Sequence, residues 1–206
     1  APVENIKHLQ SVAQLWRISE DFWDDWEALK EQFPLCRKWQ KYICKGHWPD
    51  ADMLPIGPMA QRAMRGTPRM SNFTPDEQYT MLTLWAMFRS PLMIGCNLPE
   101  IDDFTLNLIT NKEVLDINQY SKGNKELFDR NGIIAWYAQS EDELTHYIAI
   151  FNTTDKDIES YTFPLQTINY IGDGHITDLW KNESMEIKNN SVSFSVPAHG
   201  VKLIKL

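Results

Sequence analysis

The residue pattern of this chain changes near residue 120, and the change limits the folds open to it. Before that point, apolar runs alternate with segments of helical period, which is typical of a parallel α/β sheet or barrel. After it, short β-branched and aromatic runs such as "IIAWYAQ", "HYIAIFN" and "SVSFSV" are separated by Asn, Asp, Gly and Ser, a pattern that predicts an antiparallel sandwich. We expect an α/β region over residues 1–120 and an all-β domain over residues 121–206, with the boundary in "NQYSKGN".

The α/β region is too short to form a whole barrel. Helical spacing predicts helices in "ENIKHLQSVAQ" and "DFWDDWEALKEQFPLCRKWQKYI", where Pro34 should break or kink the second. Thr74, Pro75 and Glu77 form a capping box that begins a third helix, and "TLNLITN" is a short fourth one. Strands are expected at "QLWRIS", at "GHWPD" and in the apolar run "SPLMIGCNL". Three β/α units cannot close a barrel of eight strands.

Residues 55–73 separate the second expected strand from the third helix. They are rich in Pro and Gly, so we expect a long surface loop or a partly helical excursion. Loops of this length in compact domains are often functional.

Composition excludes several classes of function. The net charge of −8 argues against a nucleic-acid binder, and no apolar run of about 18 residues predicts a membrane span. The sequence contains neither a Gly-rich phosphate loop nor a G-x-S-x-G elbow. The three cysteines (Cys36, Cys44 and Cys96) leave at least one thiol unpaired, and a Cys36–Cys44 bridge and free thiols both remain open.

Polar residues stand where expected strands end, which is where barrel enzymes place their chemistry. Arg17 is followed by Asp21, beside aromatic residues that could desolvate a carboxyl and raise its pKa, as a general acid needs. Asp21 could equally be an ordinary acid of a first helical turn, the reading that we adopt for Asp24 and Asp25. Asp50 and Asp52, if on one strand, would point to the same side.

These motifs together resemble the α-galactosidase (melibiase) family, glycoside hydrolase family 27. "GHWPDADMLPIG" resembles its Gly-x-Trp-Asn-Asp-Pro-Asp-Met-Leu signature, and "LWRISEDFWDDW" resembles its Trp-Arg-x-x-x-Asp-Ile segment. "YTMLTLWAMFRSPLMIGCNL" and "LITNKEVLDINQ" are similar to later segments in the same order. The resemblance implies α/β plus all-β architecture, namely the C-terminal part of a (β/α)8 barrel, about strands six to eight, followed by the family's antiparallel β-sandwich.

The resemblance also implies roles for individual residues in a retaining glycosidase that uses two carboxylates and no cofactor or metal. Asp21 matches the acid/base, and Arg17 matches a residue that grips the sugar near its 2-position. Asp52 and Met53 match residues that line the sugar pocket, while Asp50 and Trp48 would support it from behind. For Trp48, packing beneath the pocket is favoured over lining it.

Departures from the family pattern qualify the expected substrate. Pro49 and Ala51 replace the usual Asn and Pro, and residues 55–73 look like an insertion. We therefore expect a divergent bacterial-type member that cleaves a terminal α-linked galactose or a related sugar from an oligosaccharide or glycoconjugate.

Nothing before Asp21 matches the family's nucleophile, so we expect an incomplete chain that is inactive alone. It should need the upstream half of the barrel, could oligomerise through exposed apolar surface, and should contact neither nucleic acid nor membrane. Enzymes of this kind are commonly secreted or periplasmic. Two alternatives remain: a non-catalytic carbohydrate-binding or structural module that uses tail aromatics such as Trp136 or Trp180, and a D-x-D metal-dependent glycosyltransferase.

Overall fold

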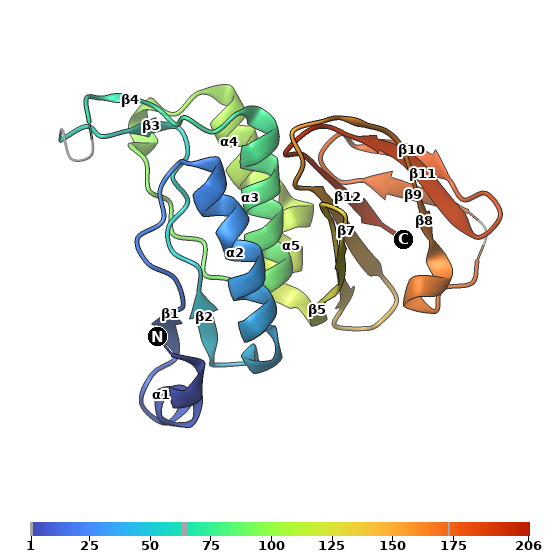
Figure 1. Cartoon of the computed structure of the whole chain (residues 1–206), viewed down its shortest axis with the longest axis horizontal. Helices are drawn as coiled ribbons and strands as arrows, with labels where there is room; N and C mark the ends of the chain where they lie inside the picture. Colours follow the sequence, from blue (N-terminus) through green and yellow to red (C-terminus); the bar gives the residue numbers. More distant parts are fainter. Residues whose placement is uncertain (1, 63–65, 173) are drawn as a thin grey trace.

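The computed structural model describes residues 2–62, 66–172 and 174–206, and it places a helical region against a large antiparallel sheet (Figure 1). The helices are α1 (Ile6–Val12), α2 (Trp26–Trp39), α3 (Pro75–Phe88), α4 (Asp103–Thr110) and α5 (Lys112–Tyr120). Single 3-10 turns, η1 to η4, cover Val3–Asn5, Gln40–Tyr42, Leu98–Glu100 and Leu165–Ile168.

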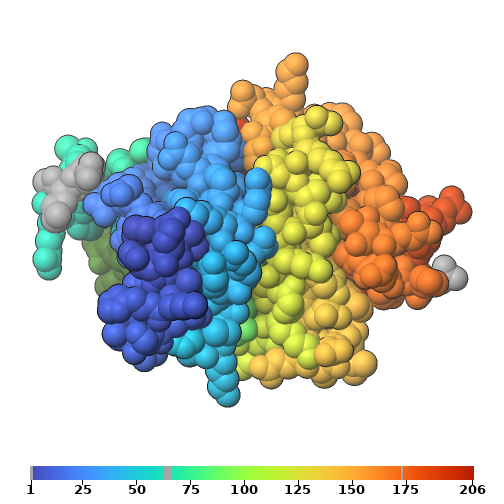
Figure 2. Space-filling view, turned by 60° about the horizontal axis from the view of Figure 1, so that its bottom comes forward, coloured from blue at the N-terminus to red at the C-terminus, as the bar shows by residue number. Residues whose placement is uncertain are grey.

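Strands before residue 120 are short. They are β1 (Leu15–Arg17), β2 (Trp48–Asp50), β3 (Pro58–Met59) and β4 (Arg69–Met70). β1 and β2 pair in parallel, whereas β3 and β4 form an antiparallel hairpin. The teal strands β3 and β4 lie at the edge of the molecule away from the sandwich (Figures 1 and 2).

Strands after residue 120 form the predicted sandwich. They are β5 (Ser121–Arg130), β6 (Ile133–Ser140), β7 (His146–Asn152), β8 (Ile158–Pro164), β9 (His175–Asp178), β10 (Glu183–Glu186), β11 (Ser191–Val196) and β12 (Val201–Lys205). The larger sheet has the order β10-β9-β12-β7-β6-β5, and β11 pairs with β8 in the smaller one. This architecture, the C-terminal part of a barrel followed by an antiparallel sandwich, is the fold class that the sequence predicted.

Both faces of the larger sheet are buried, which explains the continuous burial along β6. Because side chains alternate across a strand, Ile134 and Trp136 join the core shared with the helices. Ile133 and Ala135 point the other way, into the core between the two sheets. The helical region and the sandwich therefore share a hydrophobic core.

The helix α3 lies between α2 and the larger sheet (Figure 1). Its predicted capping box is present: Thr74 Oγ1 accepts from the Glu77 N–H at 3.2 Å, and a Glu77 side-chain oxygen accepts from the Thr74 N–H at 2.8 Å. Most of its side chains are buried, including Trp85 and Phe88. The helix thus packs against α2 and α5 on the helical side and against β5, β6, β7 and β12 of the larger sheet.

Two features of α2 differ from what was expected. Pro34 does not break the helix but lies inside it, on the exposed face, where the carbonyl that lacks a partner can bond water. The helix also begins at Trp26, with Asp25 as N-cap accepting from the Ala28 N–H at 3.1 Å, so Asp21 and Asp24 precede it.

Two connecting segments also differ from prediction. The apolar run from Pro91 to Leu98 is not a strand: Ile94 makes one isolated parallel bridge with Leu54, and Met93 and Ile94 are exposed. Residues 55–73 contain the β3–β4 hairpin and no helix within their described part, while residues 63–65 of that prediction lie outside the described residues. In the run from Pro91 to Leu98, a few backbone hydrogen bonds to the loop after β2 replace a regular strand.

The helix α5 was not predicted, although Asn111 caps it by accepting from the Val114 N–H at 3.3 Å. It ends at Tyr120, and β5 begins at Ser121 without an intervening loop. Among the helices that the structure describes, none is both long and apolar enough to traverse a bilayer.

Candidate active site

The candidate site forms where the two parallel strands end. The register places Arg17, the last residue of β1, beside Asp50, the last residue of β2. The Ile18 N–H donates to the Asp50 carbonyl at 2.9 Å and extends the pairing by one residue. The carboxyl ends of parallel strands meet at one edge, so polar residues that follow β1 and β2 converge there.

Arg17 lies at the centre of this convergence. Its Nη2 lies 2.7 Å from Asp52 Oδ2 and 3.7 Å from Asp21 Oδ1, and it also donates to the Glu20 carbonyl at 2.7 Å. Three residues of the sequence prediction (Arg17, Asp21 and Asp52) are therefore brought together from two different strands.

Asp21 lies on a short loop that a buried neighbour anchors. Phe22 packs against Phe73 and Trp85, with ring centroids 6.0 and 5.1 Å away. The side chain of Asp21 itself is 74% exposed, so the expectation of a carboxyl enclosed by aromatic residues is not met in this chain. The residue faces an open side of the molecule.

Asp52 is held in an unusual backbone conformation, with φ of 87°. Its N–H donates to Asp50 Oδ1 at 2.9 Å, and its carbonyl accepts from Trp85 Nε1 at 2.8 Å. Its Oδ2 also accepts from the Phe22 N–H at 2.7 Å. A non-glycine residue with positive φ is strained, and it keeps that conformation only where the surrounding structure holds it. Such residues cluster at functional sites.

Asp50 and Asp52 do not share one strand face, as the sequence had suggested. β2 ends at Asp50, and the turn at Asp52 rotates its side chain toward Arg17. Asp50 is buried, and that burial raises the pKa of its carboxyl; the Asp52 N–H and Arg17 act in the opposite direction, while the Asp52 charge adds to the rise. Asp50 thus supports the turn from within the protein.

Met53 is half-buried directly after Asp52 and packs close to Gly95. A Cβ placed on Gly95 would lie 2.7 Å from Met53 Sδ and 3.1 Å from the Leu54 carbonyl oxygen. A larger residue at position 95 would push Met53 away from its present position.

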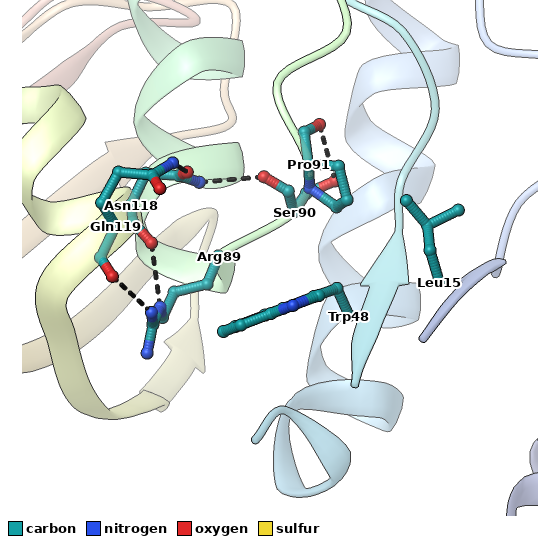
Figure 3. Close-up of a pocket in the computed structure, with 7 residues that line it drawn as sticks. All are labelled: Leu15, Trp48, Arg89, Ser90, Pro91, Asn118 and Gln119. Atoms are coloured by element: carbon teal, nitrogen blue, oxygen red, sulfur yellow. Dashed lines mark hydrogen bonds between the residues drawn. The ribbon is translucent and has the colours of Figure 1, made fainter. Parts of the chain in front are cut away.

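Trp48 lies at the opposite end of β2 from Asp50, so it neither lines this site nor packs directly beneath it. The Arg89 guanidinium lies over the indole, 4.7 Å from the ring centroid. Arg89 is fixed by bonds to the carbonyls of Asn118, Gln119 and Ser121. Figure 3 shows Trp48 between Leu15 and Arg89 in a separate cavity of about 310 Å³.

Asp24 has a structural role that the sequence analysis missed. We had interpreted it as an acid of the first helical turn, but its buried carboxylate forms a bidentate ion pair with Arg69 of β4. It also accepts from the Asn72 N–H at 2.6 Å. No local signal could have found this pair, because the partners stand 45 residues apart.

The tail aromatics do not form a binding platform. Trp136 is fully buried and packs edge-on against Phe88. Trp180 donates from Nε1 to Thr83 Oγ1 at 2.8 Å, which directs it toward α3. Both residues therefore belong to the contact between sandwich and helices.

The described residues form neither a metal site nor a disulfide. No group of three or more His, Cys, Asp or Glu side chains in these parts of the chain is arranged to hold a metal ion. The three cysteines are free thiols, and burial raises the pKa of Cys36.

Two protein families match most of this chain. The family described as "Alpha galactosidase A" matches residues 2–120, and the "Alpha galactosidase C-terminal beta sandwich domain" matches residues 131–206. An α-galactosidase from Cyamopsis tetragonoloba is 24% identical over 96% of this chain and 46% of its own length. For α-galactosidase D from Emericella nidulans, the identity is 28% over 95% of this chain and 28% of that protein.

A solved structure agrees more closely. The β-L-arabinopyranosidase of glycoside hydrolase family 27 from Geobacillus stearothermophilus is 38% identical and superposes with a TM-score of 0.94. The match covers all of this chain and 47% of that enzyme. The chain thus spans about half the length of these relatives, or less.

Proposed function

The chain belongs to the α-galactosidase (melibiase) family of glycoside hydrolases, and we propose that it supplies the acid/base half of a retaining glycosidase active site. The observation that carries the proposal is the meeting of Arg17, Asp21 and Asp52 at the carboxyl ends of β1 and β2. These are the positions that match the family's site motifs, and active sites of barrels lie at this edge.

In the proposed mechanism, Asp21 donates a proton to the leaving oxygen of the glycosidic bond. After the leaving group departs, the same carboxylate removes a proton from the water that releases the sugar. Its exposure in this chain fits the role, because the oxygen that it must reach belongs to a substrate on the open side.

Arg17 and Asp52 would bind the sugar. The ion pair between Arg17 and Asp52 lies at the same edge of the strands as Asp21. The planar guanidinium of Arg17 has several N–H donors in a fixed arrangement, which suits it to bind sugar hydroxyls. Asp50, which receives the Asp52 N–H, keeps the turn in place without touching substrate.

We propose that the nucleophile comes from a barrel segment outside this chain. A retaining enzyme needs a second carboxylate about 5 Å from the first, on the other face of the sugar. Leu15 on β1 and the exposed Met93 and Ile94 offer apolar surface for such a segment. Within the described residues, β1 pairs with β2 alone, which leaves its other edge free for a further strand.

The proposed substrate is a terminal α-D-galactopyranoside or a β-L-arabinopyranoside. These sugars share the configuration of their ring hydroxyls and differ at one hydroxymethyl group. The curated relatives act on the first sugar by name, and the Geobacillus enzyme acts on the second. The sequence identity of 38% to the latter favours the arabinopyranoside.

This proposal is tested by joining the chain to the part of the Geobacillus enzyme that it does not cover. The fusion should hydrolyse aryl β-L-arabinopyranosides or aryl α-galactosides with retention, and Asp21→Asn should abolish the reaction. A folded fusion that cleaves neither substrate would contradict the proposal.

A further inference from the structure

A hollow lies on the β-sandwich, on the face of the larger sheet that is turned away from the helices. Its volume is about 410 Å³, and β5, β6, the start of β7 and the 3-10 turn η4 surround it. The side chains that we use most line it: Lys125, Tyr137, Gln139, His146, Thr167 and Asn169. None of them belongs to the candidate active site.

The register of the larger sheet brings four of these side chains together. Lys125 of β5 pairs with Tyr137 of β6. Gln139, two residues further along β6, pairs with His146 of β7. Paired residues of antiparallel strands share a face, as do residues two apart on one strand. Because Tyr137 belongs to the core between the two sheets, all four side chains lie on that face, and η4 forms the facing wall.

A buried tyrosine and a histidine form a polar pair in this hollow. The Tyr137 hydroxyl lies 2.7 Å from His146 Nδ1, and Tyr137 is only 8% exposed. Burial lowers the pKa of His146, so its imidazole is neutral at pH 7.

The hydrogen bond between these two side chains leaves the pair one donor and one acceptor in either tautomer. They are Nε2–H and the phenol oxygen if the phenol donates to Nδ1, or the phenol O–H and Nε2 if Nδ1–H donates to the phenol. A ligand hydroxyl is itself both a donor and an acceptor. The Tyr137–His146 pair can therefore exchange hydrogen bonds with a single hydroxyl group or with two neighbouring ones.

The rest of the lining adds neutral polar groups and apolar surface. Within the described part of the chain, the side chains of Thr167 and Asn169 make no hydrogen bond to other residues, so their polar groups are available to a ligand. Leu127 and Ile168 contribute apolar surface. Among the lining residues, Lys125 is the one side chain with a full positive charge.

This combination favours an uncharged ring that carries several hydroxyl groups. A phosphate or carboxylate ligand is typically bound by arginine or by several charged donors, and this lining has a single lysine. A pyranose presents hydroxyls that both donate and accept, around a ring with apolar C–H groups. The volume of about 410 Å³ lies within the range of small-ligand sites.

We propose that this hollow binds a pyranose unit of a carbohydrate, with Tyr137, His146 and Gln139 as its main hydrogen-bonding residues. The inference goes beyond the proposed function and does not depend on Asp21. Neighbouring aromatic residues of β6 then differ in role, because Trp136 faces the helices whereas Tyr137 faces the hollow. A sugar bound there would hold the sandwich to a glycan and leave the carboxyl ends of β1 and β2 open.

The test follows backbone amide shifts by NMR while the 206-residue chain is titrated with three probes. The probes are methyl α-D-galactopyranoside, methyl β-L-arabinopyranoside and methyl α-D-glucopyranoside. Tyr137→Phe removes the phenol hydroxyl and keeps the ring. Tyr161→Phe is the matched control, because it removes the same group from a β8 residue that does not line the hollow. Gln139→Ala keeps the proposal testable if Tyr137→Phe fails to fold.

At least one probe should bind saturably, with shifts centred on β5, β6, the start of β7 and η4. Tyr137→Phe or Gln139→Ala should weaken that binding about five- to tenfold, through the loss of a hydrogen bond to the sugar. Tyr161→Phe and Asp21→Asn should bind like the parent, and the second of these separates this site from the proposed acid/base.

Three results would overturn the sugar site. They are the absence of saturable binding by any probe, shifts confined to the ends of β1 and β2, and an unchanged affinity in both Tyr137→Phe and Gln139→Ala. Each of them would leave the proposed function, which is tested by hydrolysis, untouched.

Discussion

Nη2 of Arg17 lies 2.7 Å from Oδ2 of Asp52, and that same oxygen accepts the N–H of Phe22 at 2.7 Å. One carboxylate therefore joins the end of β1 to the turn after β2 and also anchors the loop that carries Asp21. The position of the proposed acid/base depends on this connection more than on any contact of Asp21 itself.

Asp52→Ala should destabilise the chain by about 1–3 kcal/mol, because it removes the acceptor of the Phe22 N–H and one of the partners of the Arg17 guanidinium. Asp21→Ala is the matched control; its exposed side chain should be dispensable for stability. Urea denaturation of the two variants measures the difference. An Asp52→Ala chain as stable as the parent would show that the connection is not structural.

Arg69→Met should cost about 3 kcal/mol, because it leaves the buried Asp24 carboxylate uncompensated. The double variant Asp24→Asn/Arg69→Met should recover part of that loss, since no buried charge remains. Lys112→Ala, which removes an exposed ion pair with Asp116, should leave the unfolding midpoint unchanged. If the single and double variants were equally unstable, the charge of Asp24 would not be the cause.

Asp50 should make the stability of the chain depend on pH in an unusual direction. Burial raises the pKa of its carboxyl, so the folded chain holds the proton more tightly than the unfolded chain does. Ionisation thus costs stability: the cost is absent at low pH and grows as the pH rises through the raised pKa.

Asp50→Asn cannot ionise and should gain stability relative to the parent between about pH 4 and pH 7. Unfolding curves recorded across that range would reveal the trend. A relative stability that stays flat or falls with rising pH would contradict this reading of Asp50.

His199 should link the sandwich to the helices. Its Nδ1 lies 2.7 Å from Glu77 Oε1, and its ring stacks on Trp26 with centroids 3.9 Å apart. His199→Gln should lower the free energy of unfolding by about 1–2 kcal/mol, through the lost bond to Glu77 and the lost stack. His175→Gln, at an exposed position of β9, is the control and should behave like the parent; equal losses in the two variants would refute the link.

Sequence reasoning succeeded where the signal was local. The capping box of Thr74 and Glu77 needs only residues three apart, and the β-branched and aromatic composition of β6 and β7 indicates a strand within each segment alone. The motif residues Arg17, Asp21 and Asp52 were identified through resemblance, and the structure brings them together; their catalytic roles remain predictions.

Failures came where long-range contacts decide the outcome. Asp24 looked like a helix-start acid because Arg69 is distant in sequence, and the contact of Trp48 with Arg89 likewise joins residues far apart in the chain. The apolar run at residues 91–98 has strand composition but only one bridging partner, Leu54, among the described residues. The composition of a segment indicates that it can form a strand. Whether it does so depends on a partner strand beside it, which the composition does not reveal.

The most direct test of the account measures hydrolysis of aryl β-L-arabinopyranoside and aryl α-galactoside by two proteins. One is the 206-residue chain, and the other is its fusion to the part of the Geobacillus relative that it does not cover. We predict turnover by the fusion only, lost in Asp21→Asn. Asp21-dependent turnover by the 206-residue chain alone would contradict the claim that this chain holds one half of a two-carboxylate site.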